Sequence, residues 1–423
     1  MDSSLASPRL LQLRHDMEAR RPEAIPQFWL EVQATGTPLV ETDDTDPDTR
    51  LVTFLWRETG PTENVVLVEW FSNYDRTLRE KQMTRLGETD VWFKTLRIQS
   101  DISATYHFLP NDTFIKIDAD PDVVARFARM QLDPLNPLSV YPPEHAQPGL
   151  FAGSNASVFV LPDAPLLAIE DIVSRAPVTP LIEETISSKA LGYDKTIWIH
   201  APARSLEPGV VSRLLIQTDG ESVECDPLTL AMIEAAPTPL VTVLIKNTNR
   251  DVELPCNPDF ADFVADELIP YMRTHYAIAD GPAAVIMAGQ SYGGLAAVWV
   301  ALRRSDAVGN AFSQSGSFWW SPRSVADRSA NLAIGATRES CWLPTWAARE
   351  PKHQVRFWLE AGLLENAMGD GTSGLLGSNR YLRDVLTAKG YEVAYREFPG
   401  GHDHWSWRGI YLDGLRHLLH EEG

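Results

Sequence analysis

Residues 284–304 read AVIMAGQSYGGLAAVWVALRR, and this stretch decides the predicted fold. An apolar run of buried-strand length ends at Gly289, and an apolar helix follows from Ser291. The residues between them, 289–293, satisfy the pattern G-x-S-x-G. A tight strand-to-helix turn of this kind lifts the serine hydroxyl out of a sheet, and a Cβ in place of either glycine would clash in the turn. Ser291 is therefore predicted to be a nucleophile at a helix N-terminus, where partial positive charge favours a developing oxyanion.

A serine hydroxyl needs a base to accept its proton, and a candidate follows the last expected strand. Residues 400–404 read GGHDH, between the strand expected at 392–399 and a helical tail. A loop between the last strand and the last helix is where an α/β-hydrolase carries its base, and glycines let it bend over the serine. We expect His402 to be the base, with His404 as the competitor.

An acid that orients the histidine should come between the two in the chain, at the end of a strand. The segment 353–366, HQVRFWLEAGLLEN, contains two candidates. Glu360 lies inside the expected strand, whereas Glu365 lies in the loop beyond it, from which a side chain can reach the histidine. Loop placement favours Glu365. Asp370, in GDGTSG, is a more distant candidate and is better explained as a turn residue.

The sequence changes character near residue 165. Before it, short β-rich runs separated by turn residues predict an all-β module, and their alternation favours a sandwich. After it, strands alternate with helices, which predicts a mostly parallel sheet with helices on both faces. The expected divisions are an N-terminal helix at 1–24, a β-sandwich domain at 25–165 and a catalytic domain at 166–423. The clearest strands of the β module are expected at 52–58, 64–72, 91–100 and 104–110.

Composition narrows the class of protein. The chain has 423 residues, of which 44% are hydrophobic and 22% charged, values typical of globular proteins and not of disordered chains. Its net charge of −20 opposes nonspecific binding to nucleic acid or anionic lipid. The sequence has no run long enough for a membrane span or a secretory signal, so we expect a cytoplasmic protein. Cys225, Cys256 and Cys341 lack metal-ligand spacing, and we expect no metal site.

Several segments closely resemble the enterochelin esterase family. They are MAGQSYGG at 287–294, FSQSGSFWW at 312–320 and GGHD at 400–403 followed by Trp407-Arg408, and the likeness extends through the N-terminal half from about residue 25. The resemblance implies an α/β hydrolase preceded by an immunoglobulin-like β-sandwich. It also implies a cytoplasmic serine esterase that opens the trilactone of ferric catecholate siderophores such as enterobactin. No cofactor is expected, because the iron arrives only as part of the substrate.

The resemblance also implies roles for single residues. The acid of the family lies in a G-x-x-E/D segment, here residues 362–365, which supports Glu365. The oxyanion hole is similar to one formed by the backbone amide of Tyr292 and an amide after an early strand, here that of Glu221. Arg250 matches an arginine near the active site of similar esterases.

A ferric tricatecholate is both anionic and aromatic, so the site that binds it should be lined by cationic side chains and by planar ones. Of the adjacent Trp319 and Trp320, we expect one to be buried and the other to be available. Trp407 is expected to pack at a helix start. The candidate substrate-binding residues are Arg250, Trp319, Trp320 and Arg323.

Two other hypotheses stay open. One is a broader carboxylesterase or feruloyl-type esterase, whose phenolic esters would fit a similar pocket. The other is a binding module with an inert hydrolase half, against which the presence of Ser291, His402 and Glu365 argues. The sandwich could form one wall of a substrate cleft or only stabilise the fold and an oligomer, so a homo-oligomer also stays open.

Overall fold

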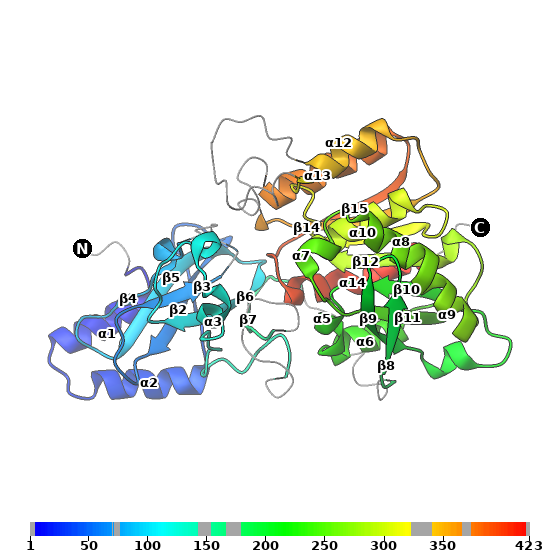
Figure 1. Ribbon diagram of the computed structural model, residues 1–423. Coiled ribbons are helices and arrows are strands. Elements are labelled where there is room, and N and C mark those ends of the chain that lie inside the picture. Colours follow the sequence, from blue (N-terminus) through cyan, green and yellow to red (C-terminus); the bar gives the residue numbers. More distant parts are fainter. Residues whose placement is uncertain are drawn as a thin grey trace. The chain divides into compact units, whose positions relative to one another are not determined.

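The computed structural model of the chain is shown in Figure 1. It divides into two compact units. The first comprises Met1–Leu166 and Pro399–Trp405, and the second comprises Leu167–Phe398 and Ser406–Gly423. The structure describes residues 5–69, 71, 77–142, 154–165, 179–322, 341–365 and 374–419.

The first unit begins with two helices, α1 (Pro8–Glu18) and α2 (Ala24–Thr35). The Ser7 hydroxyl caps α1 by accepting a hydrogen bond from the backbone N–H of Leu10 at 3.2 Å. The expectation of one helix followed by β structure was wrong, because α2 occupies the start of the expected sandwich domain. Phe28, Trp29 and Val32 are buried at helical spacing, although their aromatic and β-branched character is typical of strands.

Two antiparallel sheets follow in this unit. One has the strand order β1-β2-β5-β4 and the other β3-β6-β7. Phe54 of β2 packs against Tyr106 of β6, with ring centroids 4.7 Å apart, and against Phe159 of β7 at 5.7 Å. These aromatic contacts join the two sheets into one core. The strands are β1 (Leu39–Thr42), β2 (Thr49–Arg57), β3 (Val65–Val68), β4 (Thr84–Arg85), β5 (Val91–Gln99), β6 (Ser103–Pro110) and β7 (Ser157–Val160). Short helical turns lie at η1 (Arg79–Lys81), η2 (Ile117–Ala119) and α3 (Val123–Phe127).

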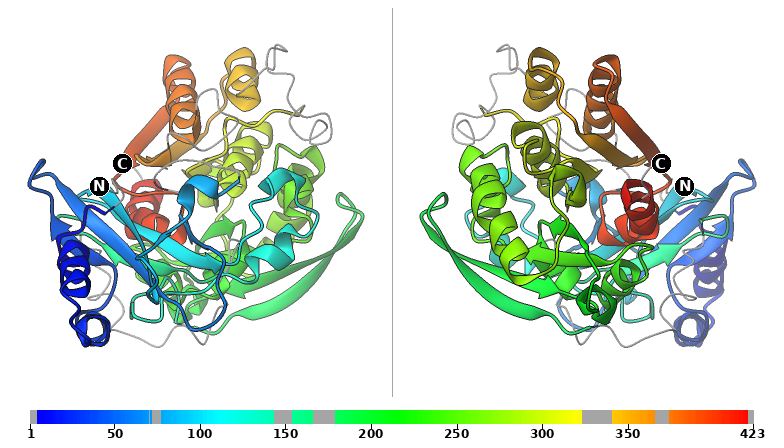
Figure 2. Two further views of the ribbon diagram at one scale, coloured as in Figure 1. Left: turned by 90° about the vertical axis from the view of Figure 1, so that its left-hand side faces the viewer. Right: turned by 90° about the vertical axis from the view of Figure 1, so that its right-hand side faces the viewer.

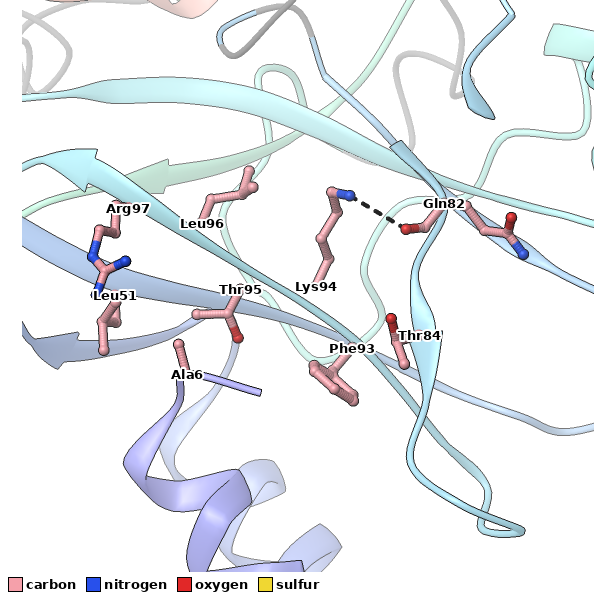
Figure 3. A pocket seen from close by; sticks show the side chains of 9 residues that line it. All are labelled: Ala6, Leu51, Gln82, Thr84, Phe93, Lys94, Thr95, Leu96 and Arg97. Atoms are coloured by element: carbon pink, nitrogen blue, oxygen red, sulfur yellow. Dashed lines mark hydrogen bonds between the residues drawn. The ribbon is translucent and has the colours of Figure 1, made fainter. Parts of the chain in front are cut away.

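A hollow of about 370 Å³ lies on the four-stranded sheet (Figure 3). Two of its lining side chains, Lys94 and Arg97, are cationic, but both have partners. Lys94 donates to the backbone carbonyls of Glu80 and Gln82, and burial lowers its pKa. Arg97 forms an ion pair of 2.5 Å with Asp43. The hollow is therefore explained by local structure and does not by itself indicate an anion site.

The second unit contains a mixed sheet with the order β15-β14-β13-β12-β10-β11-β9-β8. Strands β10 to β15 run parallel, whereas β9 is antiparallel to both β11 and β8. The parallel part agrees with the prediction. The strands are β8 (Ile182–Ser188), β9 (Tyr193–His200), β10 (Arg213–Gln217), β11 (Leu240–Ile245), β12 (Val285–Gln290), β13 (Asn310–Gln314), β14 (Arg356–Gly362) and β15 (Glu392–Phe398).

Helices cover both faces of this sheet (Figure 2). Alternate residues of β10 show it: Leu214 and Ile216 join the core beneath α8 to α10, whereas Leu215 joins the core beneath α6 and α14. Burial on both faces explains the near-continuous apolar runs of these strands. The helices are η3 (Ala203–Leu206), α5 (Gly220–Glu224), α6 (Pro227–Glu234), α7 (Arg250–Glu253), α8 (Pro258–Asp262), α9 (Ile269–His275), η5 (Pro282–Ala284), α10 (Tyr292–Arg303), α12 (Trp342–Arg349), α13 (Gly374–Ala388) and α14 (His404–Leu419).

Between α8 and α9 the chain winds as a π-helix from Phe263 to Leu268. Pro270 lies just after this turn and cannot donate a backbone hydrogen bond, so the wider turn accommodates its ring. In the described part of the chain, none of the helices has the length and apolar character needed to cross a membrane.

Candidate active site

Ser291 occupies the turn between β12 and α10 with φ 56° and ψ −118°. Residues other than glycine seldom adopt positive φ, and such strain persists only where the surrounding structure imposes it. Here the end of β13 and the loop after it hold the turn. The backbone N–H of Ser291 donates to the carbonyl of Gln314 at 3.0 Å, and the N–H of Ser317 donates to the carbonyl of Ser291 at 3.0 Å. The predicted strand–turn–helix is therefore present, with the serine in its strained position.

The flanking glycines are required by close backbone approach. A Cβ built on Gly289 would lie 2.1 Å from Thr218 Oγ1 and 2.5 Å from the carbonyl carbon of Gly293. A Cβ on Gly293 would also lie 2.1 Å from Thr218 Oγ1. Side chains at these positions would push β12 away from α10 and from the end of β10. Both glycines are thus needed for the geometry that presents Ser291.

Ser317 is a neighbour of the nucleophile that sequence analysis did not single out. Its hydroxyl oxygen lies 3.2 Å from the Ser291 hydroxyl, and the residue is 2% exposed. A hydroxyl cannot serve as a strong base, but it can hold the Ser291 Oγ in one rotamer. Ser317 belongs to the segment 312–320 already noted for its family likeness, and that likeness is the feature of the sequence that could have identified it.

The loop after β10 is held by an ion pair. Asp219 has φ 52° and is buried, and it accepts from Arg250 Nε at 2.6 Å and from Arg250 Nη2 at 2.9 Å. Asn247 Nδ2 also donates to Asp219, at 2.8 Å. Arg250 therefore fixes this loop, and 32% of its side chain remains accessible.

Glu221 lies in the first turn of α5, directly after this loop. Its carboxylate accepts from the backbone N–H of Asn247 at 2.9 Å and from Asn247 Nδ2 at 3.1 Å. It also accepts from its own backbone N–H, the group assigned to the oxyanion hole. Burial raises the pKa of Glu221, and the nearby Asp219 adds to the rise. The Glu221 carboxylate is thus held in place by hydrogen bonds from Asn247.

An aromatic and cationic surface adjoins the nucleophile. The guanidinium carbon of Arg250 lies 5.5 Å from the centre of the Tyr292 ring. The centre of the Trp319 ring lies 6.1 Å from the centre of the same tyrosine ring. All three side chains are partly exposed. Trp320 is the buried member of the tryptophan pair, at 5% exposure, and its ring packs edge-on against Trp342. Arg323 lies outside the described residues.

The two candidate acids have different surroundings. Glu360 lies within β14, is wholly buried, and accepts hydrogen bonds from Trp358 Nε1 at 2.7 Å and from Gln314 Nε2. Burial raises its pKa to about 8. Glu365 lies beyond the strand and is also wholly buried, and its Oε2 accepts from the backbone N–H of Gly362 at 2.8 Å. Asp370 lies outside the described residues.

His402 lies in the segment Pro399–Trp405, which belongs to the first unit and is anchored there. The indole N–H of Trp405 donates to Ser103 Oγ at 3.2 Å, and the ring of His404 lies 6.2 Å from that of Tyr141. His402 itself is partly exposed. His404 thus has a packing contact at the start of α14.

Trp407, in the second unit, is buried and donates to Ser315 Oγ at 2.8 Å, in agreement with its expected packing role.

Within the residues that the structure describes, no cluster of His, Cys, Asp or Glu side chains is placed to hold a metal ion.

Comparison with known proteins decides the family. A family model described as "Enterochelin esterase, N-terminal" matches residues 51–168, and one described as "Putative esterase" matches residues 188–418, more than half of the chain. The chain belongs to this esterase family. This esterase is a carboxylic ester hydrolase with a mixed sheet and helices in its catalytic part.

Two of its relatives carry the name iron(III) enterobactin esterase. The iron(III) enterobactin esterase of Escherichia coli O6:H1 is 29% identical over 86% of this chain and 90% of its own length. The iron(III) enterobactin esterase of Dickeya dadantii is 28% identical over 93% of this chain and 92% of its own length.

A solved structure of the enterobactin esterase of Shigella flexneri, in the presence of enterobactin, matches with a TM-score of 0.69 at 26% identity. The match covers 92% of this esterase and 97% of that chain.

Proposed function

We propose that this esterase hydrolyses the trilactone backbone of ferric catecholate siderophores such as enterobactin and so releases their iron. The observation that carries the proposal is the strained backbone of Ser291, at φ 56°, in a glycine-flanked turn at the start of α10. The relatives named iron(III) enterobactin esterase, which align over most of the chain, supply the substrate class.

In the proposed mechanism Ser291 Oγ attacks a lactone carbonyl while His402 accepts its proton. The tetrahedral intermediate collapses, the ester C–O bond breaks, and His402 returns the proton to the departing hydroxyl. The resulting acyl-enzyme is hydrolysed by a water molecule that His402 activates in turn. Glu365 orients His402 and stabilises its charged form.

The backbone amides of Tyr292 and Glu221 are the proposed oxyanion donors. Tyr292 supports this role because its N–H is the first of α10, directly after the nucleophile. For Glu221, the oxyanion must replace the contact between this amide and its own carboxylate. The hydrogen bonds from Asn247 to that carboxylate keep it in place while the amide changes partner.

The surroundings of the two carboxyl groups favour Glu365 as the acid. Both oxygens of Glu360 already accept hydrogen bonds from side chains inside the sheet, and its raised pKa keeps it largely protonated at neutral pH. A protonated acid cannot stabilise an imidazolium. Glu365 is buried in the loop beyond the strand, where an acid of this enzyme class acts.

Substrate contacts are proposed for Arg250 and Trp319, with Tyr292 between them. The Arg250 side chain stays 32% accessible despite its ion pair with Asp219, and a catecholate can contact it while its ring packs on tryptophan. Trp320 is proposed only as support for Trp319, since it is buried. Arg323 stays a proposed cation of the same site.

The remaining parts of the proposal follow from the family resemblance. The two sheets of the first unit form an immunoglobulin-like sandwich, for which the aromatic contacts of Phe54 are the support. The enzyme acts in the cytoplasm, without a cofactor, and iron enters only with the substrate. Nucleic acid is not a partner, which the net charge of −20 supports.

Comparison of two substrates tests the proposal. The kcat/KM of the purified enzyme is measured for ferric enterobactin and for ethyl ferulate, with a Ser291→Ala variant as the blank. A higher kcat/KM for the ferric trilactone supports the proposal. A higher value for the ferulate ester would instead make this a feruloyl-type esterase.

A further inference from the structure

A row of buried polar side chains crosses the sheet of the second unit beneath the ends of four strands. Gln217, Gln290, Gln314 and Glu360 lie on the adjacent strands β10, β12, β13 and β14. The strand register pairs Gln290 with Gln314, and Gln314 with Glu360. All four are at least nine-tenths buried. Buried amides at the ends of parallel strands are costly unless they are hydrogen-bonded, so this row needs an explanation.

The hydrogen bonds of the row all run in one direction. Gln217 Nε2 donates to Gln290 Oε1 at 3.1 Å, and Gln290 Nε2 donates to Gln314 Oε1 at 2.9 Å. Gln314 Nε2 then donates to Glu360 Oε1. The hydroxyl of Tyr411, from α14, starts the row by donating to Gln217 Oε1 at 3.0 Å. The row thus begins at a phenol and ends at a carboxyl group.

Each member of the row adjoins an element of the candidate site. Gln290 directly precedes Ser291, and Gln217 is two residues before Asp219, which Arg250 holds. The carbonyl of Gln314 accepts from the N–H of Ser291, and that of Glu360 accepts from the N–H of Ser315 at 2.7 Å. The row therefore links the oxyanion loop, the nucleophile and the strand that leads to Glu365.

We propose that Glu360 is a positioning residue for the esterase reaction: it ends the row of hydrogen bonds that holds these strand ends, and with them Ser291, in register. Glu360 acts through Gln314 and Gln290 and does not touch the substrate. The proposal rests on the proposed catalytic role of Ser291 and assigns Glu360 a task other than that of the triad acid.

A glutamine in place of Glu360 cannot preserve the row. Both partners of Glu360, Trp358 Nε1–H and the Gln314 amide nitrogen, are donors. A carboxyl oxygen can accept from them whether the group is ionised or neutral, whereas an amide nitrogen cannot accept. The Glu360→Gln variant therefore loses one hydrogen bond or must reverse every amide of the row.

Reversal of the amides has its own cost. Gln314 Nε2 also donates to the carbonyl of Trp407 at 2.9 Å, and Gln217 Nε2 also donates to the carbonyl of Thr218 at 2.9 Å. Turning these amides over would place oxygen against oxygen at both points. The direction of the row is thus set at these two carbonyl groups and at the carboxyl group of Glu360, which ends the row.

The experiment measures turnover per active serine, so that loss of folded protein does not count as loss of catalysis. Active sites are titrated with a fluorophosphonate, and kcat and KM are then measured on ferric enterobactin and on ethyl ferulate. We expect Glu360→Gln to lower kcat about tenfold or more on both substrates, with KM changed less than about twofold, and to slow labelling of Ser291.

Tyr411→Phe tests the other end of the row and serves if the Glu360 variant fails to fold. It removes the first donor and adds no group, so we expect a smaller loss of kcat, about twofold to fivefold, at nearly unchanged KM. The control Arg380→Ala removes only an exposed ion pair with Glu397 and should leave both constants unchanged.

Unchanged kcat per titrated site in Glu360→Gln, or in Tyr411→Phe where the first variant does not fold, overturns the inference and leaves Glu360 a structural residue. If the proposed function is wrong, the wild-type enzyme itself gives a different result from the one proposed. Loss of trilactone hydrolysis in the wild type, with ferulate hydrolysis retained, refutes the substrate class, and the ferulate data then judge Glu360.

Discussion

Arg250 donates two hydrogen bonds to Asp219, of 2.6 and 2.9 Å, and at the same time lies over the ring of Tyr292. The arginine thus joins the loop after β10 to the first residue of α10. Asp219 neutralises part of the charge of Arg250, and 32% of the arginine side chain remains accessible. In the proposed function, this accessible part of the arginine is the contact for an anionic catecholate.

Replacement of Arg250 should therefore affect binding more than chemistry. We expect Arg250→Ala to raise the KM for ferric enterobactin about tenfold, since a cation–aromatic contact and a charge–charge contact are lost, with a smaller change in kcat. Steady-state kinetics check this, with Arg380→Ala as the control for loss of a surface arginine. A fall in kcat alone would mean that Arg250 acts only by shaping the loop.

Gly289→Ala should disrupt the nucleophile turn. The added Cβ would lie 2.5 Å from the carbonyl carbon of Gly293, a backbone atom that cannot rotate away. We expect the free energy of unfolding to fall by about 1–3 kcal/mol, with activity lost as Ser291 moves. Denaturant titration and kinetics measure both. Gly60→Ala is the control, since no atom lies within 4 Å of its Cβ position, and equal losses in the two variants would contradict the argument.

The nucleophile turn could be predicted because its determinants are adjacent in the sequence: an apolar run, two glycines and a serine between them. The placement of Glu360 in a strand and of Glu365 beyond it was predictable for the same reason. The contacts of Ser291 with Ser317 and of Arg250 with Asp219 were not, because they join residues 26 and 31 positions apart. Only the strand order and register of the folded sheet bring such residues together.

Helix α2 is an element whose type was predicted wrongly. Its aromatic and β-branched residues are typical of strands, and packing against Leu55 and Phe93 of the sheet overrides that preference. The burial of Trp320 but not Trp319 also depends on tertiary contacts, here with Trp342, which the sequence of the two adjacent tryptophans does not reveal.

The two candidate acids can be separated by paired substitutions. Glu365→Gln should lower kcat by about 10²- to 10⁴-fold, because His402 would lose the group that orients it and supports its charge. Glu360→Gln should lower kcat less and stability more. Measurement of kcat per titrated site and of the thermal midpoint decides between them. If Glu360→Gln gives the larger kinetic loss at unchanged stability, Glu360 is the acid.

The buried carboxyl of Glu360 should also make stability depend on pH. Its pKa is raised from 4.5 to about 8, so the folded state retains a proton that the unfolded state loses above about pH 4.5. The contribution of Glu360 to stability is therefore complete below about pH 4.5 and is lost as pH rises toward 8, with a slope of at most about 1.4 kcal/mol per pH unit.

Denaturant unfolding of the wild type and of Glu360→Gln at pH 5, 6, 7 and 8 measures this slope. The difference in unfolding free energy between the two proteins should shrink steadily with rising pH. A difference that stays constant over this range would show that Glu360 titrates normally in the folded protein.

The two histidines after β15 should differ sharply. His402→Ala should lower kcat on the order of 10⁶-fold, because the serine loses its base, whereas His404→Ala should be mild, since His404 has a packing contact with Tyr141. Kinetics of both variants, with the thermal midpoint as a check on folding, test the assignment. The reverse ranking would move the base to His404.

The most direct test of the central claim joins labelling to product analysis. The wild type is treated with a fluorophosphonate and the adduct is located by mass spectrometry, while untreated, treated and Ser291→Ala enzyme are each incubated with ferric enterobactin and their products separated. We predict a single adduct on Ser291, and linear ester products from the untreated wild type only. Cleavage of the trilactone by Ser291→Ala at more than a few per cent of the wild-type rate would contradict the account.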